Sequence, residues 1–372
     1  MPLHNNPDVL EVENPETSSL KTSPKQNKRR HIYFTLISWS LSILILVGMF
    51  SVVPFREVWV AIRQVNPLFI LLAIVFSLIS LGLRGYRWAL LFSSHSPVSL
   101  QSAFSLTMIE LAVNATLPGK VGELVKIGLA TKKFRTSVIF TTATVVIERL
   151  LDGIILLILL GLSLFLLPSI NVERSVQFLG YIINNAIIIN LMKTLTFICI
   201  SLVVIVVGLA IPYTRNTLYH WLSRLPLIGQ WINQKTTTIF NDINNALNPL
   251  REIRVILQLF LYSVAIWLAQ AVYNYLISLG MIGIQLTFLQ AVAMTSIAIA
   301  VSSIPSAPGA WGVLEAGALF ALVILGVPFE QPVGVAYVLT FHAINNLLIV
   351  LLGVIFAFRE HISLNTIGKD PC

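Results

Sequence analysis

The stretch Pro118-Gly119-Lys120-Val121-Gly122-Glu123 interrupts one apolar region of the chain, and Pro308-Gly309-Ala310-Trp311-Gly312-Val313-Leu314-Glu315 interrupts another. Both contain Pro-Gly, two further residues, a glycine and then a glutamate. Proline cannot continue a helix but is favourable in the first turn of the next one. Each stretch therefore predicts a break between two helices, with Pro305 as a further helix-breaking residue before the second.

The remaining sequence is that of a membrane protein. Of the 372 residues, 56% are hydrophobic and 11% charged, with a mean hydropathy of +0.85, whereas soluble domains carry about 25% charged residues. A bilayer core of about 30 Å takes about 20 apolar residues per helix. The apolar stretches are 34–53, 67–92, 101–117, 136–167, 191–211, 255–279, 287–303, 311–325 and 332–358. They predict an all-α polytopic membrane protein with six to eight transmembrane helices.

The two breaks divide this protein into related halves. If 101–131 and 287–325 are re-entrant hairpins, three crossings lie between them, so the second hairpin enters from the opposite face. This is the inverted repeat of many transporters, with halves 34–167 and 191–358. Eight full crossings agree equally well with the charge pattern. In either case, broken helices at membrane depth must line a cavity or be buried in protein.

The distribution of basic residues predicts the orientation. Segments assigned to the cytoplasm hold 15 Lys and Arg, and external loops hold four, which favours both termini in the cytoplasm and a location in the cell membrane. The predicted domains are a disordered cytoplasmic tail at 1–33, a transmembrane domain at 34–358 that includes a cytoplasmic interfacial segment at 212–254, and a short cytoplasmic tail at 359–372.

Ten charged side chains fall inside the apolar segments or hairpins, five of each sign: Arg84, Arg87, Glu110, Lys120, Glu123, Lys126, Glu148, Arg149, Asp152 and Glu315. Each costs about 2.5–3.5 kcal/mol at mid-membrane when unpaired, so they must pair or be hydrated. Helical spacing places Arg84 beside Arg87, and it lets Arg149 reach Asp152. Glu148 then needs a partner from another helix.

Other chemistry is not predicted. Nucleotide-hydrolysis, serine-hydrolase and zinc-protease motifs are absent, the six histidines are dispersed, and the two cysteines form no ligand spacing. We therefore predict no catalytic residue, cofactor or metal. Because the basic residues flank apolar segments, they indicate membrane orientation rather than nucleic-acid binding.

Four ordered motifs resemble the flippase-like membrane region of lysylphosphatidylglycerol synthases. They are Leu83-Arg84-Gly85-Tyr86-Arg87-Trp88, then the segment from Asn114 to Glu123, then Glu148-Arg149-Leu150-Leu151-Asp152, and finally the segment from Ile304 to Glu315. The resemblance covers about 34–358. It implies a multi-pass protein that handles or translocates lipids, such as an aminoacylated phospholipid or a polyprenyl-phosphate-linked sugar.

Two differences from that family limit which of its properties can be expected of this chain. His342 stands where members of the family usually have an arginine, so the charge there is expected to depend on pH. The soluble aminoacyl-transfer domain has no counterpart, which argues against lysyl transfer by this chain.

The predicted function is binding of an anionic lipid and movement of its headgroup across the bilayer. In this hypothesis Gly119 and Lys120 hold the phosphate, while Arg84 and Arg87 attract it from the cytoplasmic leaflet. The groups that balance or relay charge are Glu123, Glu148, Glu315 and His342, and Arg149 with Asp152 holds the helix that carries Glu148. The alternatives are a glycosyl or aminoacyl transferase that uses a lipid acceptor, and an anchor for a partner lipid-modifying synthase or glycosyltransferase.

Overall fold

The computed structural model describes residues 39–40, 42–92, 98–167, 176–178, 181–183, 197, 201, 217, 242–243, 245–304 and 306–360. Several predicted features lie outside these residues: the tail 1–33, most of the crossing 191–211, most of the segment 212–254, residues 361–372 and Pro305.

Four helices are long and apolar enough to cross a membrane: α3 (Pro67–Phe92), α6 (Val138–Leu166), α10 (Ile253–Gly280) and α13 (Gln331–Arg359). Each agrees with a predicted crossing to within two residues. A fifth span is present among the described residues if the helix Ser42–Val52 is counted together with α2 (Phe55–Arg63). The all-α, polytopic fold class is therefore confirmed.

The two predicted breaks divide shorter helices. The first lies at η2 (Pro118–Lys120), between α4 (Leu100–Thr116) and α5 (Gly122–Phe134), and the second at η4 (Pro308–Ala310), between α11 (Phe288–Val301) and α12 (Val313–Ile324). The two breaks share one backbone conformation: each contains two consecutive residues with positive φ. These are Gly119 (81°) and Lys120 (54°) in the first, and Gly309 (66°) and Ala310 (59°) in the second. Two left-handed residues in a row reverse the chain direction, and a non-glycine residue adopts this conformation only at a cost.

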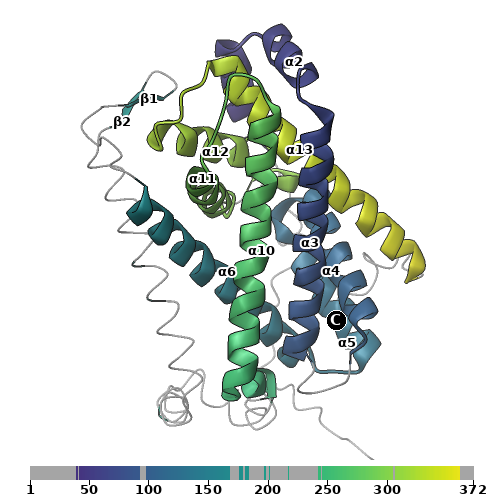
Figure 1. The fold of residues 1–372 in the computed structure, drawn as a ribbon. Helices are drawn as coiled ribbons and strands as arrows, with labels where there is room; N and C mark the ends of the chain where they lie inside the picture. The colour runs from purple at the N-terminus through teal and green to yellow at the C-terminus, as the bar shows by residue number, and fades with distance from the viewer. Residues whose placement is uncertain are drawn as a thin grey trace, which may run out of the picture.

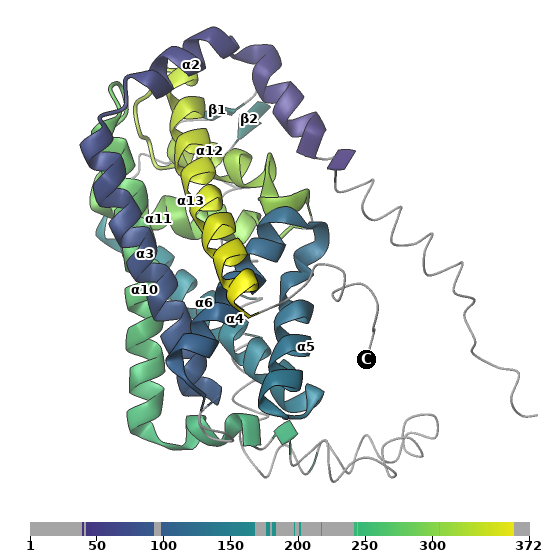
Figure 2. The same cartoon turned by 90° about the vertical axis from the view of Figure 1, so that its right-hand side faces the viewer.

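The helices pack as an inverted repeat requires. Helix α3 packs against its counterpart α10, and the two are antiparallel, since the Asn66 N–H before α3 donates to Gly280 O at the end of α10 over 2.8 Å. Helix α4 packs against α13, and the corresponding pair is α11 with α6. The hairpin of α4 and α5 occupies one half of the molecule and that of α11 and α12 the other (Figures 1 and 2).

The bend before α2 was not predicted. The chain turns by 88° between Val52 and Phe55, where Pro54 precedes the helix. The exposed face of α2 carries Trp59 and Val60 and its ends carry Glu57 and Arg63, so α2 is an amphipathic helix suited to the membrane interface.

Two smaller elements complete the fold. A short antiparallel pair, β1 (Val176–Phe178) and β2 (Tyr181–Ile183), departs from the helical pattern. A single turn, η3 (Asn248–Arg251), precedes α10.

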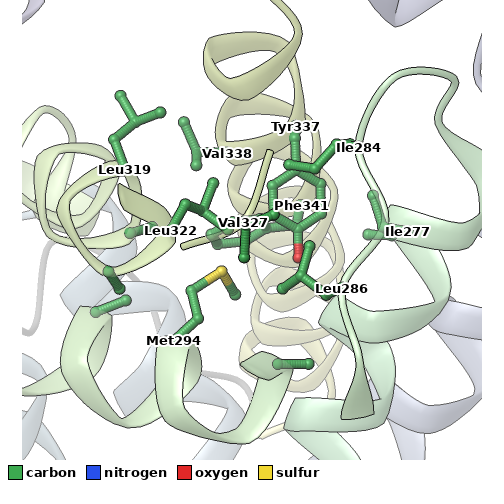
Figure 3. Packing of buried hydrophobic residues seen from close by; sticks show 14 of the residues in the cluster. Ile277, Ile284, Leu286, Met294, Leu319, Leu322, Val327, Tyr337, Val338 and Phe341 are labelled. Carbon is green, nitrogen blue, oxygen red and sulfur yellow. The ribbon is translucent and has the colours of Figure 1, made fainter. Parts of the chain in front are cut away.

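The largest apolar core lies in the second half of the chain. Met294 on α11 and Leu322 on α12 pack toward Tyr337 and Phe341 on α13 (Figure 3). The Tyr273 hydroxyl on α10 donates to the Phe341 carbonyl, and the Tyr337 hydroxyl donates to Asn274 O over 2.9 Å. This core fixes α13 beside the second break.

Candidate functional site

A buried lysine joins both arms of the first hairpin to α6. Lys126 Nζ on α5 lies 2.6 Å from Glu110 Oε2 on α4 and 2.9 Å from Glu148 Oε2 on α6, and all three side chains are at most 1% exposed. The same ammonium stands 4.6 Å from the centre of the Trp88 ring, where the ring face attracts a cation. Glu148 thus finds its partner on another helix, as the sequence required.

An arginine from α3 completes this network. Arg87, with a fully buried side chain, donates from Nη1 to Asp152 Oδ1 (2.7 Å) and to Ser263 Oγ (2.9 Å), and from Nη2 to Glu148 Oε1 (3.2 Å). Arg84 lies 3.7 Å from Asp152 Oδ2 and over the Trp267 ring of α10. Together these contacts connect α3, α6 and α10.

Arg149 forms the outer edge of the network. It is 3.0 Å from Glu110, 3.5 Å from Glu123 and 3.5 Å from Asp152, while its side chain remains 36% exposed. A fourth contact, to Glu148 at 3.8 Å, means that this one arginine touches every carboxylate of the network. The predicted contact with Asp152 is present, but the contact with Glu110 is shorter.

The eight charges balance. The cations are Arg84, Arg87, Lys126 and Arg149, and the carboxylates are Glu110, Glu123, Glu148 and Asp152. Buried charges are tolerated when they are paired and hydrogen-bonded. The network therefore holds helices together without leaving a net charge of its own.

A smaller polar cluster lies at the second break. Glu315 Oε2 accepts the Gly312 N–H at the start of α12 (2.7 Å), and Glu315 Oε1 is 2.6 Å from His342 Nδ1. His342 Nε2 is 2.8 Å from both Gly309 O and Asn346 Nδ2. Glu315 is thus a helix cap and a partner of His342, and its side chain is fully buried.

The two breaks meet at a cavity of about 300 Å³. A Cβ placed on Gly309 would lie 3.1 Å from Ala115 O, so the second break packs closely on the end of α4. The polar residues that line the cavity are Asn114, Lys120, Glu123, Arg149, Ser302, Ser303, Ser306, His342, Asn345 and Asn346. Broken helices that face a polar cavity satisfy the requirement that freed backbone groups are not left in lipid.

Lys120 differs from the other intramembrane cations. It is exposed to the cavity, and within the described part of the chain it forms no ion pair or hydrogen bond, including with Glu123. Glu123 is the carboxylate that attracts Lys120, but it also lies 3.5 Å from Arg149 and belongs to the balanced network, so Lys120 adds a positive charge to the cavity.

The cavity brings together only part of the predicted site. Gly119, Lys120, Glu123, Arg149, Gly309 and His342 line it, whereas Arg84, Arg87, Glu148, Asp152 and Glu315 do not. Arg84 and Arg87 were predicted to attract a phosphate, and the structure places the Arg87 side chain among Asp152, Glu148 and Ser263. Pro118 and Pro308 stand at the breaks, as predicted.

Several residues of the site were missed or left without a role. Glu110 and Lys126 were identified only as charges in apolar stretches, because their contact depends on how the hairpin folds back. Asn114 was not singled out, although its Oδ1 accepts the Gly122 N–H over 2.8 Å at the start of α5. Asn114 lies eight residues before Gly122, and this spacing alone does not predict a hydrogen bond between them.

Comparison with known proteins agrees with the fold and the motifs. The family described as the lysylphosphatidylglycerol synthase TM region matches residues 35–353, which include every residue that lines the cavity. No curated protein matches the sequence. The match extends over most of the chain, and the chain therefore belongs to the lysylphosphatidylglycerol synthase TM region family.

Proposed function

We propose that this protein binds the phosphate of an anionic membrane lipid in the cavity between the two breaks and moves the lipid headgroup across the bilayer. Membership of the family indicates a membrane protein that handles lipid headgroups. The specific step of translocation is our proposal, as is the placement of the phosphate next to Gly119 and Lys120.

The observation that carries the proposal is the unpartnered ammonium of Lys120. A cation at membrane depth is costly unless an anion or water meets it. Glu123 attracts Lys120 but forms no hydrogen bond or ion pair with it, and Glu123 lies 3.5 Å from Arg149 Nε in the balanced network. Lys120 also lies two residues before α5, whose N-terminus favours a negative charge.

The inverted packing supports movement rather than binding alone. Transporters with inverted repeats place the ligand at the interface of their two halves and alternate its access by moving one half relative to the other. Here Gly119 and Lys120 come from the first half, and Gly309, His342 and Asn346 from the second. A headgroup between them would contact both halves.

The carboxylates favour translocation over transfer chemistry. A general base must reach its substrate, but Glu148 is 1% exposed and held by Lys126 and Arg87. Glu315 is fully buried, and both its oxygens are engaged. Among the described residues that line the cavity, Glu123 is the only acidic one, and the alternative of a glycosyl or aminoacyl transferase would have to use it as the base.

The orientation and domain limits belong to the same proposal. Both termini face the cytoplasm, the transmembrane domain extends over 34–358, and the segment 212–254 lies at the cytoplasmic interface. In this orientation the α4–α5 hairpin enters from the cytoplasm and the α11–α12 hairpin from outside the cell.

The test uses the full chain in liposomes that contain a fluorescent short-chain phosphatidylglycerol, with phosphatidylcholine as the zwitterionic comparison. A membrane-impermeant quencher measures how fast the labelled headgroup changes sides. We expect Lys120→Met to lose phosphatidylglycerol binding and movement by at least tenfold, and Lys120→Arg to restore only part, because a planar guanidinium and a compact ammonium contact a phosphate differently.

Lys132→Met is the matched control, since Lys132 is an exposed residue near the end of α5 and does not line the cavity. It should behave like the wild type. Wild-type binding and movement in Lys120→Met would refute the proposed phosphate site.

A further inference from the structure

The pair of Glu315 and His342 has hydrogen-bonding partners for two different proton counts. Glu315 accepts the Gly312 N–H at Oε2 and faces His342 Nδ1 with Oε1, at 2.7 and 2.6 Å. One proton therefore lies between the carboxylate and Nδ1 in every state of the pair. Whether a second proton is present is decided at His342 Nε2.

Nε2 lies between a donor and an acceptor at equal distance. The Asn346 amide nitrogen and the Gly309 carbonyl oxygen are both 2.8 Å away. Without a proton, Nε2 accepts from Asn346. With a proton, it donates to Gly309 O, and the second break is tied to α13. Neither state leaves this nitrogen without a partner, so neither is excluded by an unsatisfied buried group.

The second proton changes the charge of the cavity. With one proton the pair carries a charge of −1, which cancels the +1 of Lys120. With two protons the pair is neutral, and Lys120 leaves the cavity with a net charge of +1. The eight-membered network contributes nothing to this difference because its charges balance.

The other charged groups around His342 already have partners or lie across the cavity, so the change of protonation is assigned to the Glu315–His342 pair. From α12 it faces Glu315, and across the cavity are Lys120, Glu123 and Arg149. Helix α4, which packs on α13, carries Glu110, and this carboxylate is held by Lys126 and Arg149. Among the described residues, α10 and α3 contribute uncharged groups: the Tyr273 hydroxyl bound to Phe341 O, and the Ser77 hydroxyl bound to Asn345.

We propose that the protein takes up a proton at the Glu315–His342 pair when it binds an anionic phosphate in the cavity, so that anion and proton bind together as a neutral unit. This inference rests on the proposed function, since it takes the ligand to be the same phosphate. A monoanion binds more tightly to a cavity of charge +1 than to one of charge 0, and by linkage the bound anion favours the protonated pair. The proton comes from water in the cavity, which His342 lines.

The neighbouring indole gives a direct signal. The Trp311 and His342 rings have centroids 4.4 Å apart and are tilted by 36°. A cation at this distance from an indole interacts with its π-face, so protonation of His342 is expected to change Trp311 fluorescence. The chain has seven tryptophans, and Trp311→Phe identifies which part of the signal belongs to this one.

The experiment adds short-chain phosphatidylglycerol to the purified full chain in weakly buffered detergent and measures bound lipid, proton uptake with a pH indicator, and fluorescence. The wild type should take up as much as about one proton per bound lipid, the limit for one linked site. At higher pH, lipid affinity should fall about tenfold per pH unit, the limit for one linked proton.

Variants of His342 and Lys120 distinguish the hypothesis of linked proton uptake from the hypothesis of the phosphate site. His342→Gln should bind lipid only with the weak affinity that the wild type shows at high pH, without proton uptake and with no Trp311 signal. His342→Arg should bind lipid with an affinity independent of pH. If either variant fails to fold, the other gives the same test. Lipid binding by the wild type without proton uptake, or full uptake in His342→Gln, would overturn this inference and leave the phosphate site standing. Retained binding in Lys120→Met would instead refute the phosphate site.

Discussion

Arg87 on α3 and Asp152 on α6 form a buried ion pair whose Nη1 and Oδ1 atoms are 2.7 Å apart. The Trp267 indole N–H of α10 donates to the same carboxylate oxygen over 3.0 Å. Three of the long helices therefore meet at one carboxylate. The pair also explains why two arginines can stand in an apolar helix: one is sealed by opposite charge, and the other lies over the Trp267 ring.

Asp152→Asn should destabilise the protein strongly, because it leaves Arg84 and Arg87 without their shared carboxylate. Removing one member of a buried pair costs about 3–5 kcal/mol. The double variant Arg87→Met, Asp152→Asn should recover most of this loss, since the remaining network has three charges of each sign. Thermal unfolding in detergent measures both. Equal destabilisation of the single and double variants would show that the pair is not coupled.

The same substitution at two lysines should give opposite results. Lys126→Met removes the cation between Glu110 and Glu148 and leaves two buried carboxylates facing each other, so folded yield and thermal stability should drop sharply. Lys120→Met removes a cation that forms no hydrogen bond or ion pair among the described residues, and stability should stay near that of the wild type.

Adding Glu110→Gln to Lys126→Met should restore part of the stability, because the remaining network has three charges of each sign and Glu148 keeps its contact with Arg87. A large loss of stability in Lys120→Met, as severe as in Lys126→Met, would mean that Lys120 is structural and would contradict its assignment as a free cation.

The elements could be predicted from sequence because they depend on local features. A run of apolar residues sets the length of a span, and Pro118 and Pro308 mark the breaks whatever the rest of the fold does. Helix α2 was missed because a search for 20-residue apolar runs treats a short amphipathic helix as loop. Its apolar positions Phe55, Val58, Trp59 and Ile62 follow helical spacing and offered a signal.

The pairing of charges could be predicted only within one helix. Arg149 and Asp152 are three residues apart, and their contact was expected from spacing alone. Lys126 meets Glu110 and Glu148 only because the hairpin folds back and packs on α6. For the same reason Arg87 appeared available to a ligand, although α6 and α10 enclose it. Long-range packing decides which charge is sealed and which one faces the cavity.

Gly122 should be irreplaceable where α5 crosses α4. A Cβ at this position would lie 2.1 Å from Glu110 O and 2.7 Å from Asn114 Oδ1, so Gly122→Ala must push the two arms of the hairpin apart. We expect destabilisation of about 1–3 kcal/mol, the usual range for overpacking. Gly128→Ala in the same helix is the control, because nothing lies within 4 Å of its Cβ. It should be neutral or slightly stabilising, and an equal loss in both variants would exclude the steric explanation.

The proposed orientation predicts which positions a membrane-impermeant thiol reagent reaches in intact cells. The background should lack both native cysteines, through Cys199→Ser and Cys372→Ser. Gln64 lies between α2 and α3, and Ile282 follows α10; the hydrogen bond from Asn66 N–H to Gly280 O places these two loops at the same end of the molecule. With the cytoplasm assigned to the more basic segments, Gln64→Cys and Ile282→Cys should label readily, since both residues are exposed.

Lys132→Cys, at the exposed end of α5, should label only after the cells are permeabilised. Labelling of Lys132→Cys in intact cells, with protection of the other two, would invert the orientation and make the α4–α5 hairpin enter from outside.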